Sequence, residues 1–196
     1  MSHNKRLWWV LGVMFVLSFT ALGLIGGNIY KKAPPVPDAV TTTNGTVVLT
    51  KDDIQRGRQV WQSMGGHQVG SIWGHGGYVA PDWSADWLHR ESLALMDLWS
   101  LEQYGTPYED LAVGRRGLLQ ARLKAELRQN TYDAGSGNIV ISPERAQAIG
   151  QVADHYVALF GNDLEMEPLR EQYAIANGAV PDPAHREALT AFFFWT

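Results

Sequence analysis

The chain has 196 residues, 45% of them hydrophobic, a net charge of -4 and no cysteine. This length suits one globular domain with a membrane segment, not a multidomain soluble enzyme. The absence of cysteine excludes disulfides, thiolate metal sites, iron–sulfur clusters and covalent haem attachment through a CxxCH motif. The acidic balance gives no indication of a nucleic-acid partner.

Residues 7–27 predict a transmembrane helix. The segment runs for 21 residues without a charge, and as an α-helix it would be about 32 Å long, enough to cross a bilayer core. A signal peptide would have a shorter apolar region and a small-residue cleavage site. Aromatic residues suited to the membrane interfaces flank the segment: Trp8, Trp9 and Tyr30. Two basic residues precede it and two follow it, so the positive-inside rule leaves its orientation undecided.

The prolines between residues 34 and 37, followed by small polar residues, predict an extended linker. We therefore assign residues 1–32 to a membrane anchor, residues 33–49 to the linker and residues 50–181 to a folded domain.

The domain is expected to be mainly α with a small β hairpin. Thr50 followed by acidic residues is typical of a helix start, and Gly57 on the apolar face of that helix would let another helix pack closely. Further helices are expected over about residues 84–105, 113–128 and 142–161. The Gly-Ser-Gly turn and short apolar run within residues 130–142 predict the hairpin.

Residues 182–196 end in the apolar run ALTAFFFWT. Nine residues of helix span about 14 Å, less than half of a bilayer core, and consecutive phenylalanines are unusual without a partner. We expect this segment to be the start of a second transmembrane helix, so that the chain is the N-terminal portion of a longer membrane protein.

The most unusual segment is residues 65–78, which contains six glycines together with His67, Trp73 and His75. Glycine-rich loops let the backbone approach another group closely. No Gly-Lys-Ser/Thr or GxGxxG pattern accompanies the glycines, which argues against a phosphate-binding loop. A metal site formed by His67 and His75 is geometrically possible, but their spacing matches no compact ligand pattern and favours structural roles.

No other group of residues indicates chemistry. Four further histidines are expected to be solvated or to cap helices: His3, His89, His155 and His185. The basic residues of residues 115–128 alternate with a leucine stripe and are interpreted as a solvated helix face. No nucleophile, base and orienting group occur together, so the residues alone predict no catalytic and no cofactor-binding residue.

Residues 57–91, GRQVWQSMGGHQVGSIWGHGGYVAPDWSADWLHRE, resemble the N-terminal extracytoplasmic region of quinol-dependent nitric oxide reductases, the single-chain members of the haem–copper oxidase superfamily. Residues 126–142 and the closing ALTAFFFWT are similar as well, so the resemblance covers essentially the whole chain. It implies a cytochrome c-like domain that one transmembrane helix tethers to a catalytic helix bundle.

The resemblance also bears on cofactors. In the two-subunit relatives a CxxCH motif attaches a haem and is closely followed by GxGxY. Alignment of residues 74–78 with GxGxY places Gly66, Val69 and Gly70 where the cysteines and the haem-ligating histidine would stand, which implies no c-type haem here. By the same comparison, the backbone carbonyls of Gly76 and Tyr78 would help to hold a calcium ion, for which carbonyl oxygens are suitable ligands.

The resemblance implies an enzyme that reduces NO to N2O and water with electrons from quinol. Its haem b groups and non-haem iron would lie in the catalytic helix bundle of the same full-length chain, and this portion alone would be inactive. The expected location is the bacterial cytoplasmic (inner) membrane, with the main domain extracytoplasmic. The partners would be quinol, nitric oxide and membrane lipid, without nucleic acid. The alternative is a standalone membrane-anchored sensor or scaffold domain that binds a metal through His67 and His75.

Overall fold

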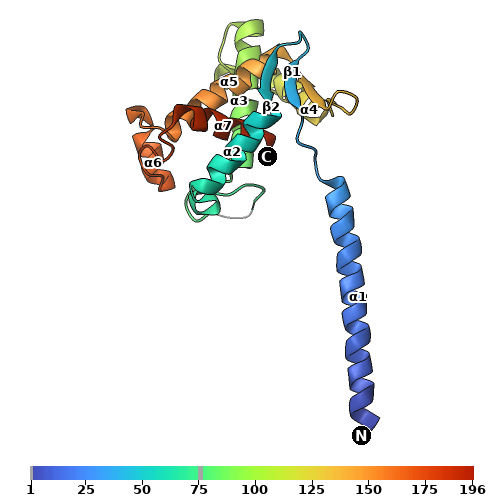
Figure 1. Cartoon of the computed structure of the whole chain (residues 1–196). Helices are drawn as coiled ribbons and strands as arrows, with labels where there is room; N and C mark the ends of the chain where they lie inside the picture. Colours follow the sequence, from blue (N-terminus) through green and yellow to red (C-terminus); the bar gives the residue numbers. More distant parts are fainter. Residues whose placement is uncertain (1, 75–76) are drawn as a thin grey trace. The chain divides into compact units, whose positions relative to one another are not determined.

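The computed structural model describes residues 2–74 and 77–196. These residues form two compact units, with the division between Pro35 and Val36. The first unit consists mainly of one long helix, and the second combines helices with a small sheet (Figure 1). The predicted class, mainly α with a small β element, is confirmed.

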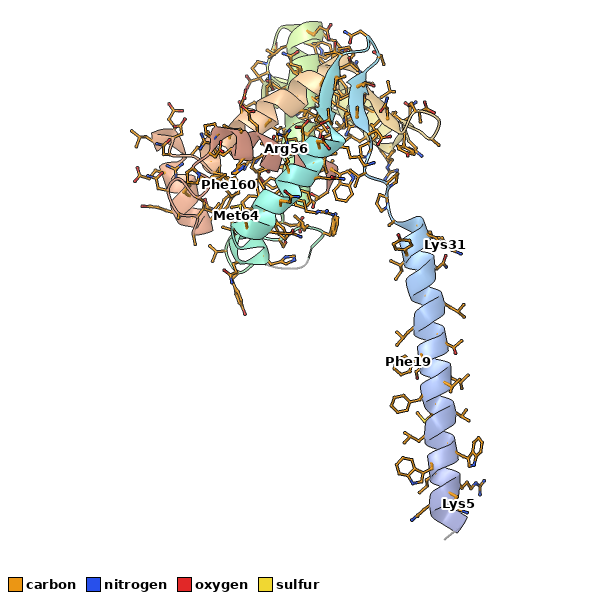
Figure 2. All side chains as sticks on the ribbon, viewed as in Figure 1. Lys5, Phe19, Lys31, Arg56, Met64 and Phe160 are labelled. Atoms are coloured by element: carbon orange, nitrogen blue, oxygen red, sulfur yellow. The ribbon has the colours of Figure 1, made fainter. Side chains whose placement is uncertain are left out.

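The helix α1 (Ser2–Lys32) covers the predicted membrane segment. It is long and apolar enough to cross a membrane. Figure 2 shows side chains such as Phe19 projecting from α1, with Lys5 and Lys31 near its two ends. Exposed apolar side chains between charged ends are the pattern expected of a helix surrounded by lipid chains.

The segment expected to be a linker belongs mostly to the domain. Its strands β1 (Ala39–Thr42) and β2 (Val47–Thr50) form an antiparallel hairpin. β1 also pairs in parallel with β4 (Asn138–Ile141), which pairs antiparallel with β3 (Tyr132–Asp133), so the sheet order is β2-β1-β4-β3. Val40 is fully buried. The prediction of an extended linker over residues 33–49 was therefore wrong beyond residue 35, because alternate residues of β1 face the core.

The predicted helices of the domain are confirmed close to their expected bounds. They are α2 (Lys51–Ser63), α3 (Trp83–Tyr104), α4 (Val113–Arg128) and α5 (Pro143–Leu159). α2 begins with a capping box, in which Asp53 Oδ2 accepts a hydrogen bond from the Thr50 backbone N–H at 2.9 Å. Four short elements were not predicted: η1 (Gly66–Val69), η2 (Tyr108–Asp110), η3 (Leu164–Met166) and α6 (Glu167–Tyr173).

The last helix, α7 (Pro183–Trp195), lies inside the domain. Leu189, Phe192 and Phe193 are at most 1% exposed, and α7 packs against α2, α3 and α5. Figure 1 shows α7 passing beside α2. The expectation that residues 182–196 begin a second transmembrane helix is corrected by this placement, because the aromatic run has its partners in the domain core.

The helices α2 and α7 come very close to each other at Gly57. A Cβ atom added to Gly57 would lie 1.9 Å from the backbone oxygen of Ala188 and 2.8 Å from Cβ of Phe192. Glycine therefore lets the two backbones come together. This confirms the prediction that Gly57 admits a neighbouring helix, and the neighbour comes from the opposite end of the domain sequence.

We expect Gly57→Ala to lower the free energy of unfolding of the domain by about 3 kcal/mol or more, because the added methyl group must push α7 away. The matched control is Gly150→Ala on α5, where an added Cβ meets no atom within 4 Å. There the change should stabilise the helix by about 0.5–1 kcal/mol. Urea unfolding followed by tryptophan fluorescence measures both effects, and equal midpoints for the two variants would contradict the close contact.

Candidate functional site

The glycine-rich segment connects α2 to α3 and is the strongest candidate for a functional site. Gly65, Gly66, Gly70 and Gly74 all have positive φ angles, between 50° and 118°, so the backbone follows a path that favours glycine. Its middle is fixed against the start of α3 by two backbone hydrogen bonds. Ser71 N donates to the oxygen of residue 81 at 3.2 Å, and the N–H of residue 83 donates to Ser71 O at 2.7 Å.

The indole of Trp83 lies beneath this segment and is fully buried. Its Nε1 donates a hydrogen bond to the backbone oxygen of Val69 at 3.0 Å. The ring stacks on Phe193 at a centroid distance of 5.5 Å and meets Phe160 and Tyr156 edge to face. Trp83 therefore joins the loop to the aromatic core, with its polar N–H satisfied by the loop.

Gly70 lies directly against this indole. A Cβ atom at Gly70 would be 2.3 Å from Trp83 Nε1 and 2.9 Å from the backbone oxygen of Pro81, and its φ is +118°. At Gly66, whose φ is +50°, an added Cβ would lie 3.3 Å from the ring of Trp61. The two backbone positions thus disfavour any side chain, and position 70 has no space for one.

The carboxylate of Asp82 holds the loop in place. Its Oδ2 accepts hydrogen bonds from Ser71 Oγ at 2.8 Å and from the backbone N–H of Gly74, while Oδ1 accepts from Ala85 N at 3.0 Å and caps α3. Burial opposes ionisation of Asp82, but the hydrogen bonds from Ala85, Gly74 and Ser71 outweigh it, so the pKa of this carboxyl lies below its usual value. The sequence interpretation placed the helix start at Ser84 and missed Asp82, although aspartate is a preferred capping residue.

Buried charges join α3 to α5 beside the aromatic core. Glu91 is 2% exposed, and its carboxylate accepts hydrogen bonds from Arg145 Nε at 2.6 Å and Trp87 Nε1 at 2.9 Å. One turn earlier, Asp86 Oδ2 accepts from Arg90 Nε at 2.7 Å and from the hydroxyl of Tyr156 at 2.6 Å. Burial, followed by the bond to Asp86, raises the pKa of Tyr156 far above its ordinary value. These groups satisfy one another, which indicates a structural network and not an acid–base site.

His155 is less solvated than expected. It is half-buried, and its Nε2 is buried and has no hydrogen-bond partner among the described residues. Burial, with repulsion from Arg90 as the second cause, lowers the pKa of His155, while Asp86 opposes the shift. The prediction of a solvated or capping residue is corrected for His155, because its helix turns part of the ring toward the charged groups of α3.

Three other histidines are exposed, as expected. They are His67, His89 and His185. The ring of His67 meets Trp61 edge to face at a centroid distance of 4.9 Å, in agreement with a structural role. The side chain of His3 lies outside the described residues.

The structure gives limited information on the predicted metal sites. Within residues 2–74 and 77–196, no three or more histidine, aspartate or glutamate side chains are grouped as metal ligands. His75, the second histidine of the alternative metal site, and Gly76 of the expected calcium site both lie outside the described residues. Tyr78, the other residue expected at calcium, is fully exposed. Calcium at Gly76 and Tyr78 stays a prediction.

A family model for the cytochrome c-like domain of NorB, a nitric oxide reductase polypeptide, matches residues 37–196. The match begins beside the first strand of the domain and continues through α7, so it includes the glycine-rich loop and the aromatic core. A comparison with individual curated proteins gives no match.

We expect Gly70→Ala to destabilise the domain by about 3 kcal/mol, because the methyl group would collide with Trp83 at a backbone angle that already disfavours alanine. Gly74→Ala is the matched control. Its φ is +73°, but an added Cβ meets no atom within 4 Å, so it should cost only about 1 kcal/mol. Urea unfolding of both variants separates the collision from the backbone strain, and a cost for Gly70→Ala no larger than the control would contradict the packing described here.

Proposed function

Because the chain belongs to the family of NorB cytochrome c-like domains of nitric oxide reductase, we propose that it is the membrane-anchored domain of a quinol-oxidising nitric oxide reductase. One quinol would supply two electrons and two protons. Two NO molecules would then give one N2O and one water, with quinone as the oxidised product. The membrane anchor supports this function, since quinol is a lipid-soluble donor and α1 is long and apolar enough to cross a membrane.

The contact between Gly70 and Trp83 carries the choice of quinol. The resemblance assigns a haem-ligating histidine to position 70, where a Cβ atom would lie 2.3 Å from Trp83 Nε1. Position 66, assigned to a cysteine, faces the ring of Trp61. These residues do not fit a c-type haem. Electrons would therefore reach the catalytic groups directly from quinol, without a haem in this domain.

We assign the haem b groups and the non-haem iron to a catalytic helix bundle of the same full-length protein. The described residues contain no grouped set of metal-ligating side chains, and the charged residues beside the core are paired with one another. The role of the present domain would then be structural, as a rigid extracytoplasmic part of an enzyme in the bacterial inner membrane. The sensor or scaffold alternative has less support, because the family match extends through the whole domain.

The test uses the full-length protein in membranes, supplied separately with a reduced benzoquinone and with reduced soluble cytochrome c. We expect NO consumption with one N2O formed per quinol oxidised, and no turnover with cytochrome c alone. Heat-inactivated protein controls for direct reaction between quinol and NO. Acid–acetone extraction should remove all haem from the polypeptide. Turnover only with cytochrome c, or haem retained covalently by this domain, would overturn the proposal.

We also propose that the backbone carbonyls of Gly76 and Tyr78 contribute to a calcium site. The exposure of Tyr78 supports a cation held between this loop and another part of the enzyme, since calcium takes several oxygen ligands that can come from different segments. Elemental analysis of the washed full-length protein should find bound calcium. It should be reduced when Gly76→Pro distorts the loop, with Gly114→Ala on the distant α4 as a control. Calcium-free protein with full activity would rule this site out.

A further inference from the structure

The helix α4 concentrates positive charge on an otherwise acidic domain. It carries five basic residues and one acidic residue, although the whole chain has a net charge of -4. Elsewhere in residues 36–196 there are 19 acidic residues and seven basic ones. The basic residues of α4 are Arg115, Arg116, Arg122, Lys124 and Arg128. A concentration of one sign of charge on one helix indicates a partner of the opposite sign.

Most basic side chains elsewhere in the domain already have partners. Four form ion pairs, and two donate to backbone carbonyls. The ion pairs are Lys51–Asp38, Arg56–Asp53, Arg90–Asp86 and Arg145–Glu91, and the two arginines bound to carbonyls are Arg170 and Arg186. On α4, Arg115 and Arg122 lie over the rings of Tyr104 and Trp99. Ring contacts of this kind position the guanidinium groups but leave their positive charge available.

The outer face of α4 is flat at its centre. Gly114, Gly117, Ala121 and Ala125 are exposed, and a Cβ atom added to either glycine meets no atom within 4 Å. At about 100° per residue, Arg122 and Lys124 lie on opposite sides of this small-residue face, with Arg128 close to its centre. A broad planar partner could therefore come close to the backbone, with cationic side chains reaching it on both sides.

The chain also keeps this helix near a bilayer. Residues 33–35 separate α1 from Val36, which packs against the domain core. The tether between Lys32 and Val36 can therefore extend to at most about 14 Å. Asp38 N donates a hydrogen bond to Gly137 O at 2.8 Å, in the turn of the hairpin that directly follows α4. The tether thus enters the domain beside the segment that leads out of α4.

We propose that the outer face of α4 rests on anionic lipid headgroups of the membrane that holds α1. The short tether keeps the domain at the membrane surface, where even a weak electrostatic attraction is effective because the local concentration of lipid is high. The small residues let the helix approach a planar surface, and Lys124 and Arg128 reach the phosphates. This surface is exposed, as the sequence interpretation expected, and the proposal adds its occupant. It goes beyond the proposed reductase function and does not depend on it.

The experiment uses the full chain in vesicles, either of phosphatidylcholine alone or of phosphatidylcholine mixed with phosphatidylglycerol. Because the protein has no cysteine, Ala121→Cys provides a single site for a fluorescent label on the outer face of α4. Spin-labelled lipids should quench this label about threefold more in the anionic vesicles, and high salt should remove the difference. A label at Gln172→Cys, exposed on the acidic α6, should show no such rise.

The decisive variant is Lys124→Gln with Arg128→Gln, which removes two positive charges and should abolish the rise in quenching. The matched variant Lys124→Arg with Arg128→Lys keeps both charges and should retain it. Equal urea midpoints for the two double variants show that the domain is folded in both. Equal quenching in neutral and anionic vesicles overturns the proposal. So does self-association of the chain that protects position 121 in neutral vesicles, since a second copy would then be the occupant.

Discussion

The position of Trp83 is the constraint on which the rest of the domain depends. Its fully buried ring contacts aromatic side chains from α5, α6 and α7, and its N–H binds the oxygen of Val69 in the glycine-rich loop. Each such aromatic pair contributes about 0.5–1.5 kcal/mol beyond the burial of apolar area. The same ring sets the path of the loop and fills the interior beneath it. The loop and the core are therefore one unit, and a change in either would disturb the other.

Local sequence signals were sufficient where a helix is determined by its own residues. Thr50 and Ser142 cap α2 and α5, and Gly105 ends α3 in a left-handed conformation, as their types suggested. Prediction was less successful where the partner is distant in sequence. β1 pairs with β4 far along the chain, so its four residues resembled a linker. The aromatic run of α7 resembled a membrane segment because α2, α3 and α5, which cover it, are brought together only by the fold.

The same distinction applies to the candidate site. The resemblance drew attention to positions 66, 69 and 70 by residue type, and the structure adds the physical reason, since the indole of Trp83 occupies the space beside Gly70. Asp82 could have been suspected as a helix cap, but its bonds to Ser71 and Gly74 depend on how the loop folds back. The ion pair between Glu91 and Arg145 joins residues of different helices. No local pattern reveals such a pair, and its burial is tolerated because both partners are present.

The packing of α2 against α7 determines when the domain can fold. These helices begin and end the helical part of the domain, and they meet at Gly57 and Ala188. β1, near the start of the domain, likewise waits for β4. Contacts between such distant segments form slowly, because a long stretch of chain must first be closed into a loop. During synthesis the domain would therefore stay largely unfolded, held at the membrane by α1, until nearly all of it has emerged. A chaperone that shields its aromatic segments during this interval would have a specific and brief task.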